Sequence, residues 1–214
     1  MTTRAAYLPN LVAFCALVAV VLIWLVSSPD ARSAMNEEGG PVEVASAVSY
    51  VVLAVLTVVL VRSTMGRVLG LILFLFALRE WDMDKTAFTE GLLKARQYTG
   101  DRVGLVEKLL SFALLMLILF AVGYMLVKGT PPLLRALRRG SAWAFAIVIA
   151  AACLVVAKTI DGIERKLSPF SVRFSEETLE AFKSLEETLE LGAPMFLAAA
   201  LFRYARDTTA DGAA

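Results

Sequence analysis

Charged side chains lie where the hydropathy of this chain predicts membrane-spanning helices. Arg79 and Glu80 end one apolar run, Lys158 lies near the end of another, and Glu190 lies near the start of a third. An ionised side chain at mid-bilayer costs about 2.5–3.5 kcal/mol on insertion scales, so a cluster of them is a functional-site hypothesis by default. We therefore expect these charges to face inward and to form a polar pocket.

The residue types in this predicted pocket point to two kinds of ligand. Carboxylate oxygens suit a hard divalent cation, Ca²⁺, Mg²⁺ or Mn²⁺. The candidate metal ligands are Glu80, Asp84, Asp161, Glu187 and Glu190. Arg79 would bind a phosphate through two parallel hydrogen bonds and Lys158 as a point charge, so a phospholipid or polyprenyl-phosphate headgroup is the other candidate. Burial would fit Glu80 or Glu190 to act as a general acid or base.

Pro194 adds a backbone group to the same place. A proline has no N–H to donate to the carbonyl four residues earlier, which here is the carbonyl of Glu190. Freed backbone groups within a membrane are tolerated where protein, water or an ion satisfies them. The small residues Gly192 and Ala193 would allow another group to approach closely.

The composition excludes several kinds of chemistry. The chain contains no histidine, which argues against a Ser-His-Asp triad, a structural zinc site and haem ligation through imidazole. Cys15 and Cys153 each fall in the middle of an apolar run, as small core residues do. The formal net charge of +1 predicts no nucleic-acid partner.

The elements that must position these residues are membrane-spanning helices. The chain is 58% hydrophobic with a mean hydropathy of +0.71, and its apolar residues come in long blocks. We predict an all-α polytopic membrane protein, one compact domain of about six transmembrane helices over residues 1–214. The predicted spans are 8–26, 44–61, 68–81, 105–127, 142–160 and 189–204, and an acidic amphipathic helix over about 174–188 continues into the last span. Pro and Gly residues at 29, 39–41 and 129–132 mark the predicted breaks between helices.

The distribution of charge predicts the orientation. Of the twenty acidic residues, all but Asp207 and Asp211 fall on one side of the predicted membrane. The other side carries short loops that are rich in arginine and nearly free of acids, which is typical of the cytoplasmic face. We therefore predict an inner-membrane protein with both termini in the cytoplasm, and a pocket that opens on the extracytoplasmic side. Arg135–Arg139 is predicted as a short basic amphipathic stretch on that cytoplasmic face.

The rise per residue of an α-helix converts the spacing of these charges into their depth in the membrane. From Arg67 to Arg79 the helix rises about 18 Å, and from Glu190 to Arg203 about 20 Å, at ~1.5 Å per residue. The hydrocarbon core is ~30 Å thick. If Arg67 and Arg203 mark the cytoplasmic edge, Glu80 and Glu190 lie below the opposite boundary.

Three functions fit this pattern. The first is binding of a divalent cation or a lipid phosphate in the pocket, with lipid modification as an extension. The second is a non-enzymatic membrane subunit or scaffold in which the charges form structural salt bridges. The third is an ion or proton channel or transporter, with a pore between copies of the chain in a homo-oligomer. The spacing of Gly66 and Gly70, and an alanine-rich stretch over 144–157, favour close helix packing.

Overall fold

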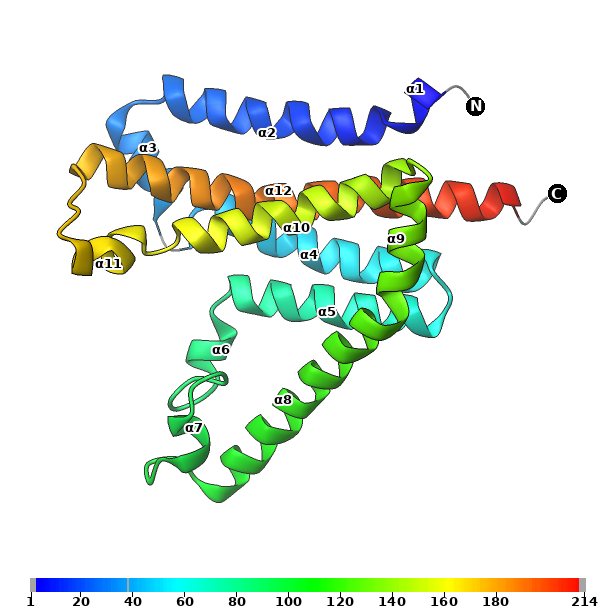
Figure 1. Ribbon diagram of the computed structural model, residues 1–214. Helices are drawn as coiled ribbons and strands as arrows, with labels where there is room; N and C mark the ends of the chain where they lie inside the picture. The colour runs from blue at the N-terminus through cyan, green and yellow to red at the C-terminus, as the bar shows by residue number, and fades with distance from the viewer. Residues whose placement is uncertain (1–2, 38, 212–214) are drawn as a thin grey trace. The chain divides into compact units, whose positions relative to one another are not determined.

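The computed structural model describes residues 3–37 and 39–211 (Figure 1). For nine of these residues it describes only the backbone: Thr3, Arg4, Pro29, Asn36, Asp84, Lys85, Thr209, Ala210 and Asp211. The described chain is 82% helical and contains no strand. Four helices are long and apolar enough to cross a membrane, namely Leu8–Val26, Pro41–Leu60, Leu105–Arg138 and Ala142–Ile160. The all-helical prediction is thus confirmed, and the count of six spans stays a prediction.

The chain divides into two compact units. Unit 1 comprises Met1–Ser46 and Ala136–Ala214, and unit 2 comprises Ala47–Arg135. The boundaries cut through two helices, α4 (Pro41–Leu60) and α9 (Thr130–Arg138). Assembly into the single predicted bundle therefore stays a prediction, and each unit is described by itself.

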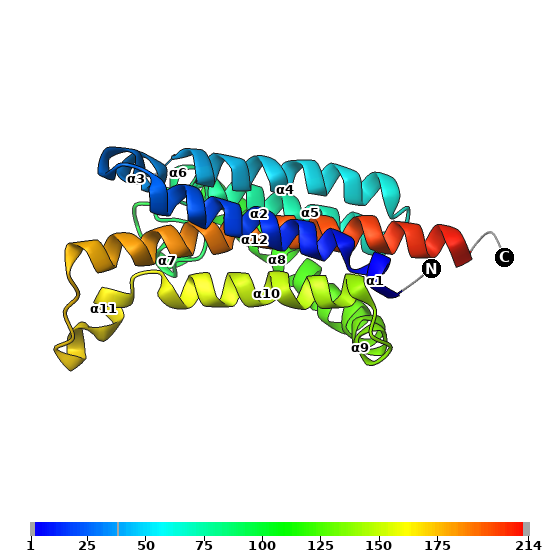
Figure 2. The same cartoon turned by 90° about the horizontal axis from the view of Figure 1, so that it is seen from above.

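Unit 1 is built on one long helix. Its elements are α1 (Thr3–Ala6), α2 (Leu8–Val26), α3 (Pro29–Asn36), α10 (Ala142–Ile160), α11 (Ile163–Leu167), η2 (Ser168–Phe170) and α12 (Glu176–Asp211). Helix α12 runs alongside α10 and α2 (Figures 1 and 2). The predicted amphipathic segment and the predicted last span are thus parts of one 36-residue helix with Pro194 inside it.

Small residues bring the helices of unit 1 together. Ala146 of α10 and Ala199 and Ala200 of α12 are buried in one cluster. A side chain at Gly192 would lie 2.8 Å from Leu17 of α2 and 3.5 Å from Cys153 of α10. The close approach expected at Gly192 is thus made by apolar side chains of neighbouring helices. This is internal packing, as small residues at membrane helix contacts commonly provide.

Side chains also join the ends of these helices. The buried Asn10 donates to the carbonyl of Ala142 at 3.0 Å, and Tyr7 donates to the carbonyl of Gly140 at 2.8 Å. At the other end of α2, Arg32 donates to the carbonyls of Trp24 and Ser27, each at 3.1 Å. Carbonyls in the last turn of a helix have no partner within it, so Arg32 closes this end.

Unit 2 carries the rest of α4 and the helices that follow. These are α5 (Thr64–Glu80), α6 (Met83–Thr86), α7 (Arg96–Thr99), α8 (Leu105–Tyr124), η1 (Met125–Gly129) and most of α9. A side chain at Gly70 of α5 would lie 2.5 Å from Val58 and 3.1 Å from the carbonyl of Ala54, both in α4. The predicted close packing at Gly70 is therefore used between α4 and α5.

The break predicted at residues 129–132 does not separate two helices. Leu105–Arg138 is one helical stretch of 34 residues, with a π-helical turn, η1, in its middle. The prolines at 131 and 132 fall in the first turn of α9, where a helix tolerates a missing N–H. The prolines therefore bend the helix instead of ending it.

Candidate functional site

The predicted site residues divide between the two units. Arg79, Glu80 and Asp84 belong to unit 2. Lys158, Asp161, Glu187 and Glu190 belong to unit 1. The prediction that both groups line one pocket stays a prediction. Within each unit, the structure shows which charges meet.

Arg79 and Glu80 form an ion pair at the C-terminal end of α5. The guanidinium Nη1 lies 3.2 Å from the Glu80 carboxylate Oε1. The Glu80 side chain is 3% exposed, whereas that of Arg79 is 42% exposed. Trp81 then ends the helix, with its N–H bonded to the carbonyl of Ala77. A buried carboxylate requires such a partner because desolvation of an ion costs several kcal/mol.

Asp84 lies in α6, the short helix that follows α5. The backbone turns into α6 through Asp82, which has a positive φ of 50°. The structure describes only the backbone of Asp84. Its predicted role as a metal ligand beside Glu80 therefore lies outside the described side chains.

Lys158 and Asp161 also form an ion pair, at the C-terminal end of α10. Both side chains reach solvent, with exposures of 66% and 33%. The hydrogen bond from Lys158 lowers the pKa of Asp161, and the positive charges of Lys158, Lys166 and Arg165 add to this effect. Lys166 also donates to the carbonyl of Lys158 at 2.8 Å. This end of α10 is thus held by charge-assisted contacts among exposed groups.

The third group of charges lies on α12, before Pro194. The buried Ser46 donates a long hydrogen bond, 3.5 Å, to the carbonyl of Glu190. This is the carbonyl that loses its helical partner to Pro194. A hydroxyl from α4 thus meets the backbone group that the sequence predicted to be freed.

Glu187 stands among other carboxylates at this end of α12. Burial, together with the negative charges of Glu190, Glu43 and Glu186, raises its pKa to about 7, and the positive charge of Lys183 opposes this shift. Like charges at close range disfavour ionisation of a half-buried acid. The arrangement attracts a proton or another cation.

Two residues that act on Glu187 and Glu190 were not predicted from the sequence. Glu43 and Ser46 lie in the first turns of α4, where we predicted only an apolar span over 44–61, which begins after Glu43. The signal was present, since an acid and a serine follow Gly39-Gly40-Pro41 at the start of that span. Nothing in the local sequence indicates that they lie beside α12.

A hydrogen-bond network in unit 2 was also missed. The carboxylate of Glu107 accepts from the Thr89 N–H at 2.7 Å, the Thr89 hydroxyl at 3.0 Å and Gln97 Nε2 at 2.9 Å. Gln97 is fully buried, and its Oε1 accepts from the Glu90 N–H at 3.0 Å. The connection between α6 and α8 is therefore a folded loop with its own polar centre.

Neither unit brings together a full set of metal ligands among its described side chains. Among the described side chains, no group of three or more acidic or cysteine residues is placed to hold a metal ion. Cys15 is an exposed and Cys153 a buried free cysteine. Comparison with protein-family models, curated proteins and solved structures finds no match to this chain.

Proposed function

We propose that this chain is a six-span protein of the cell (inner) membrane, with both termini in the cytoplasm. The four long apolar helices support the membrane location. Helix α5, with 17 residues, and the part of α12 after Glu187 would supply the other two spans. A bilayer-spanning helix needs about 20 residues, and local thinning of the bilayer accommodates shorter ones.

The proposed activity is binding of a hard divalent cation at the extracytoplasmic end of α12. The observation that supports it is that the charges of Glu190, Glu43 and Glu186 all act on the half-buried Glu187 and raise its pKa, although no three of the described acids are already placed as metal ligands. The Glu190 carbonyl at Pro194, already in contact with Ser46, adds an oxygen of the kind that Ca²⁺ and Mg²⁺ accept. A bound cation would offset the repulsion among these carboxylates.

In this proposal Arg79 and Lys158 do not bind the cation but have a structural role. Each already faces a carboxylate, Glu80 and Asp161 respectively. These pairs favour the second candidate function, a scaffold whose charged helix ends are structural. A lipid phosphate would reach Arg79 and Lys158 only by competing with their acids. Lipid modification with Glu80 or Glu190 as acid or base, and conduction between copies of the chain, stay predictions.

A thermal-shift series on detergent-purified protein tests the cation site. At pH 8, Ca²⁺, Mg²⁺ or Mn²⁺ should raise the melting temperature of the wild-type protein above its value in EDTA, because a ligand of the folded state stabilises it. Glu187→Gln and Glu190→Gln should each lose most of this rise. Glu176→Gln, an exposed acid at the start of the same helix, should keep it.

Two results would overturn the proposal. One is a wild-type melting temperature that no divalent ion changes. The other is an equal rise in Glu187→Gln and Glu176→Gln, which would mean that ions act through the general acidity of the helix. In either case the scaffold function would replace cation binding as the proposed function.

A further inference from the structure

The connection between α6 and α8 is a folded element of unit 2, here called the 87–104 loop. It spans residues 87–104 and includes α7 (Figure 1). Leu92, Gln97 and Val103 are buried within it, and Tyr98 donates to the carbonyl of Leu92. Connections of this length that are not disordered are usually functional. A plain linker would not require a buried glutamine to organise it.

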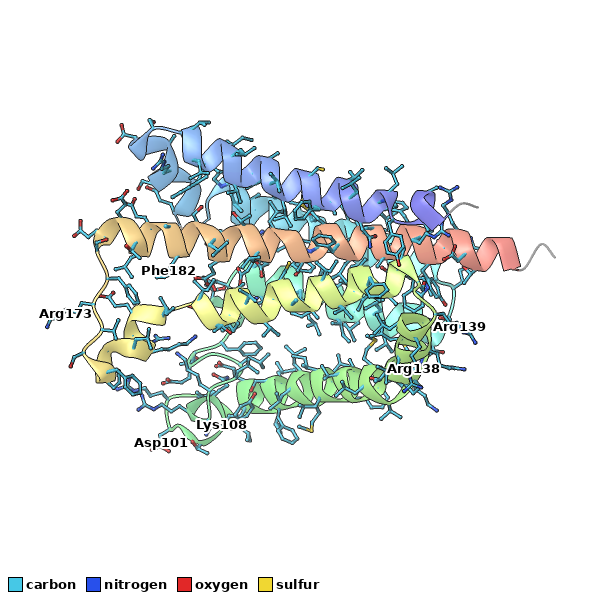
Figure 3. All side chains as sticks on the ribbon, turned by 45° about the horizontal axis from the view of Figure 1, so that its top comes forward. Asp101, Lys108, Arg138, Arg139, Arg173 and Phe182 are labelled. Atoms are coloured by element: carbon cyan, nitrogen blue, oxygen red, sulfur yellow. The ribbon has the colours of Figure 1, made fainter. Side chains whose placement is uncertain are left out.

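The fold of the loop places acidic and basic side chains differently. The carboxylate of Glu107 is directed into the loop, where three hydrogen bonds hold it. Lys94, Arg96 and Arg102 are exposed, and none of the three makes an ion pair with a described side chain. The loop also carries two acids, the exposed Asp101 and the half-buried Glu90, and Figure 3 places Asp101 at the same end of unit 2 as Lys108. The three basic groups outnumber these acids, and the loop has a net charge of +1.

Apolar side chains lie next to these basic groups. Leu93 is 73% exposed although it directly follows the buried Leu92. Leu105 and Val106, which begin α8, are 73% and 71% exposed. Trp81, at the other end of the connection, is 45% exposed, and exposed tryptophans favour the interface between membrane and water. Helix α8 continues this apolar surface, since only 11% of its most apolar stretch is buried.

We propose that the 87–104 loop is a preformed binding surface for the headgroups of anionic phospholipids. The occupant follows from charge complementarity and from continuity with the lipid-facing surface of α8. Lys94, Arg96 and Arg102 contact lipid phosphates, and Leu93 inserts between the headgroups, as basic and apolar residues do at membrane surfaces. The buried Gln97 network keeps the loop in this shape before lipid arrives. The residues of this surface belong to unit 2 and the α12 carboxylates to unit 1, so the two proposals rest on different residues.

The test is a titration of detergent-purified full-length protein with phosphatidylglycerol, in EDTA so that no divalent ion bridges the components. The melting temperature should rise with phosphatidylglycerol and much less with phosphatidylcholine. The variant Lys94→Gln/Arg96→Gln/Arg102→Gln should need at least about tenfold more phosphatidylglycerol for the same rise, since each basic group contributes on the order of a few-fold. All three positions are exposed, so the variant should melt like wild type without added lipid.

A matched variant separates a defined surface from bulk charge. Arg165→Gln/Arg173→Gln/Lys183→Gln removes the same charge from exposed positions of unit 1. It should keep the wild-type response. An equal loss in both variants, or no preference for phosphatidylglycerol in the wild type, would overturn the proposal.

The depth of Leu93 gives an independent measurement. A spin label at Leu93→Cys, in a Cys15→Ser/Cys153→Ala background in nanodiscs, should collide with dissolved oxygen more than with a water-soluble nickel complex. A label at Asp101→Cys should show the reverse preference. If both labels collide mainly with the nickel complex, the loop stands in water and its apolar residues serve a protein partner, contrary to the proposal.

Discussion

The ion pairs at the ends of α5 and α10 look alike in the sequence and differ in the structure. Each places a base and an acid at the last turn of an apolar helix. Glu80 is 3% exposed beside Arg79, whereas Lys158 and Asp161 are 66% and 33% exposed. The comparison teaches that depth estimated from spacing does not decide burial. Neighbouring helices decide it.

Energetics should follow this difference. A buried pair makes each partner depend on the other, because removing one leaves a desolvated charge. When one member of an exposed pair is removed, water solvates the other, and the protein loses little stability. A third site, on α12 before Pro194, departs from both, because the charges that act on Glu187 are mainly those of other acids. The three sites therefore predict three sizes of effect.

The largest effect is expected at α5. Arg79→Ala removes an ion-pair partner from a buried carboxylate and should destabilise the protein by up to about 3–5 kcal/mol. Thermal unfolding in detergent measures this as a large fall in melting temperature. The double variant Arg79→Ala/Glu80→Leu should recover much of the loss, because no charge remains buried. A loss in the double variant as large as in Arg79→Ala would show that the pair is not what Arg79 stabilises.

An intermediate, pH-dependent effect is expected at α12. The pKa of Glu187 is raised from 4.5 to about 7 in the folded protein, so the folded state binds a proton more tightly than the unfolded state does. Stability should therefore fall as pH rises from about 4.5 to about 7 and then level off, by on the order of 1–3 kcal/mol. Glu187→Gln should remove this dependence.

Melting temperatures between pH 4.5 and pH 8.5 in EDTA check the direction. Glu176→Gln serves as the control and should keep the wild-type slope. The groups that set the slope are Glu190, Glu43, Glu186 and Lys183, which act on Glu187 from α4 and α12. A wild-type protein that gains stability across this range would contradict the burial of Glu187 among acids.

The apolar helices were the most predictable part of the fold. Helix α10 covers residues 142–160, as predicted, because its apolar run begins after Gly140 and ends at Asp161. The helical class and the four long apolar helices of the described chain follow from the same kind of signal, long runs of apolar residues. The break at 129–132 was wrong because prolines in the first turn of a helix cost little. A π-turn could not be anticipated from composition.

The candidate site was less predictable, for a physical reason. Pairs within one helix end, such as Lys158 with Asp161 three residues later, follow from spacing along the chain. The contact of Ser46 with the carbonyl of Glu190 joins residues far apart in sequence. Gln97 lies in a polar loop without periodicity, yet it is fully buried. Tertiary packing decides such contacts, and a single sequence carries no local signal of it.

The smallest effect is expected at α10, and it tests the comparison most directly. Lys158→Ala should cost at most about 1 kcal/mol, because both partners reach water and gain little from each other there. The cost should shrink further in 1 M salt, where charges are screened within about 3 Å. Arg79→Ala should keep most of its effect in the same salt, since screening ions do not enter a buried site. Equal salt sensitivity at the two sites would mean that Glu80 is solvated in the membrane-embedded protein, and the contrast between the two helix ends would then fail.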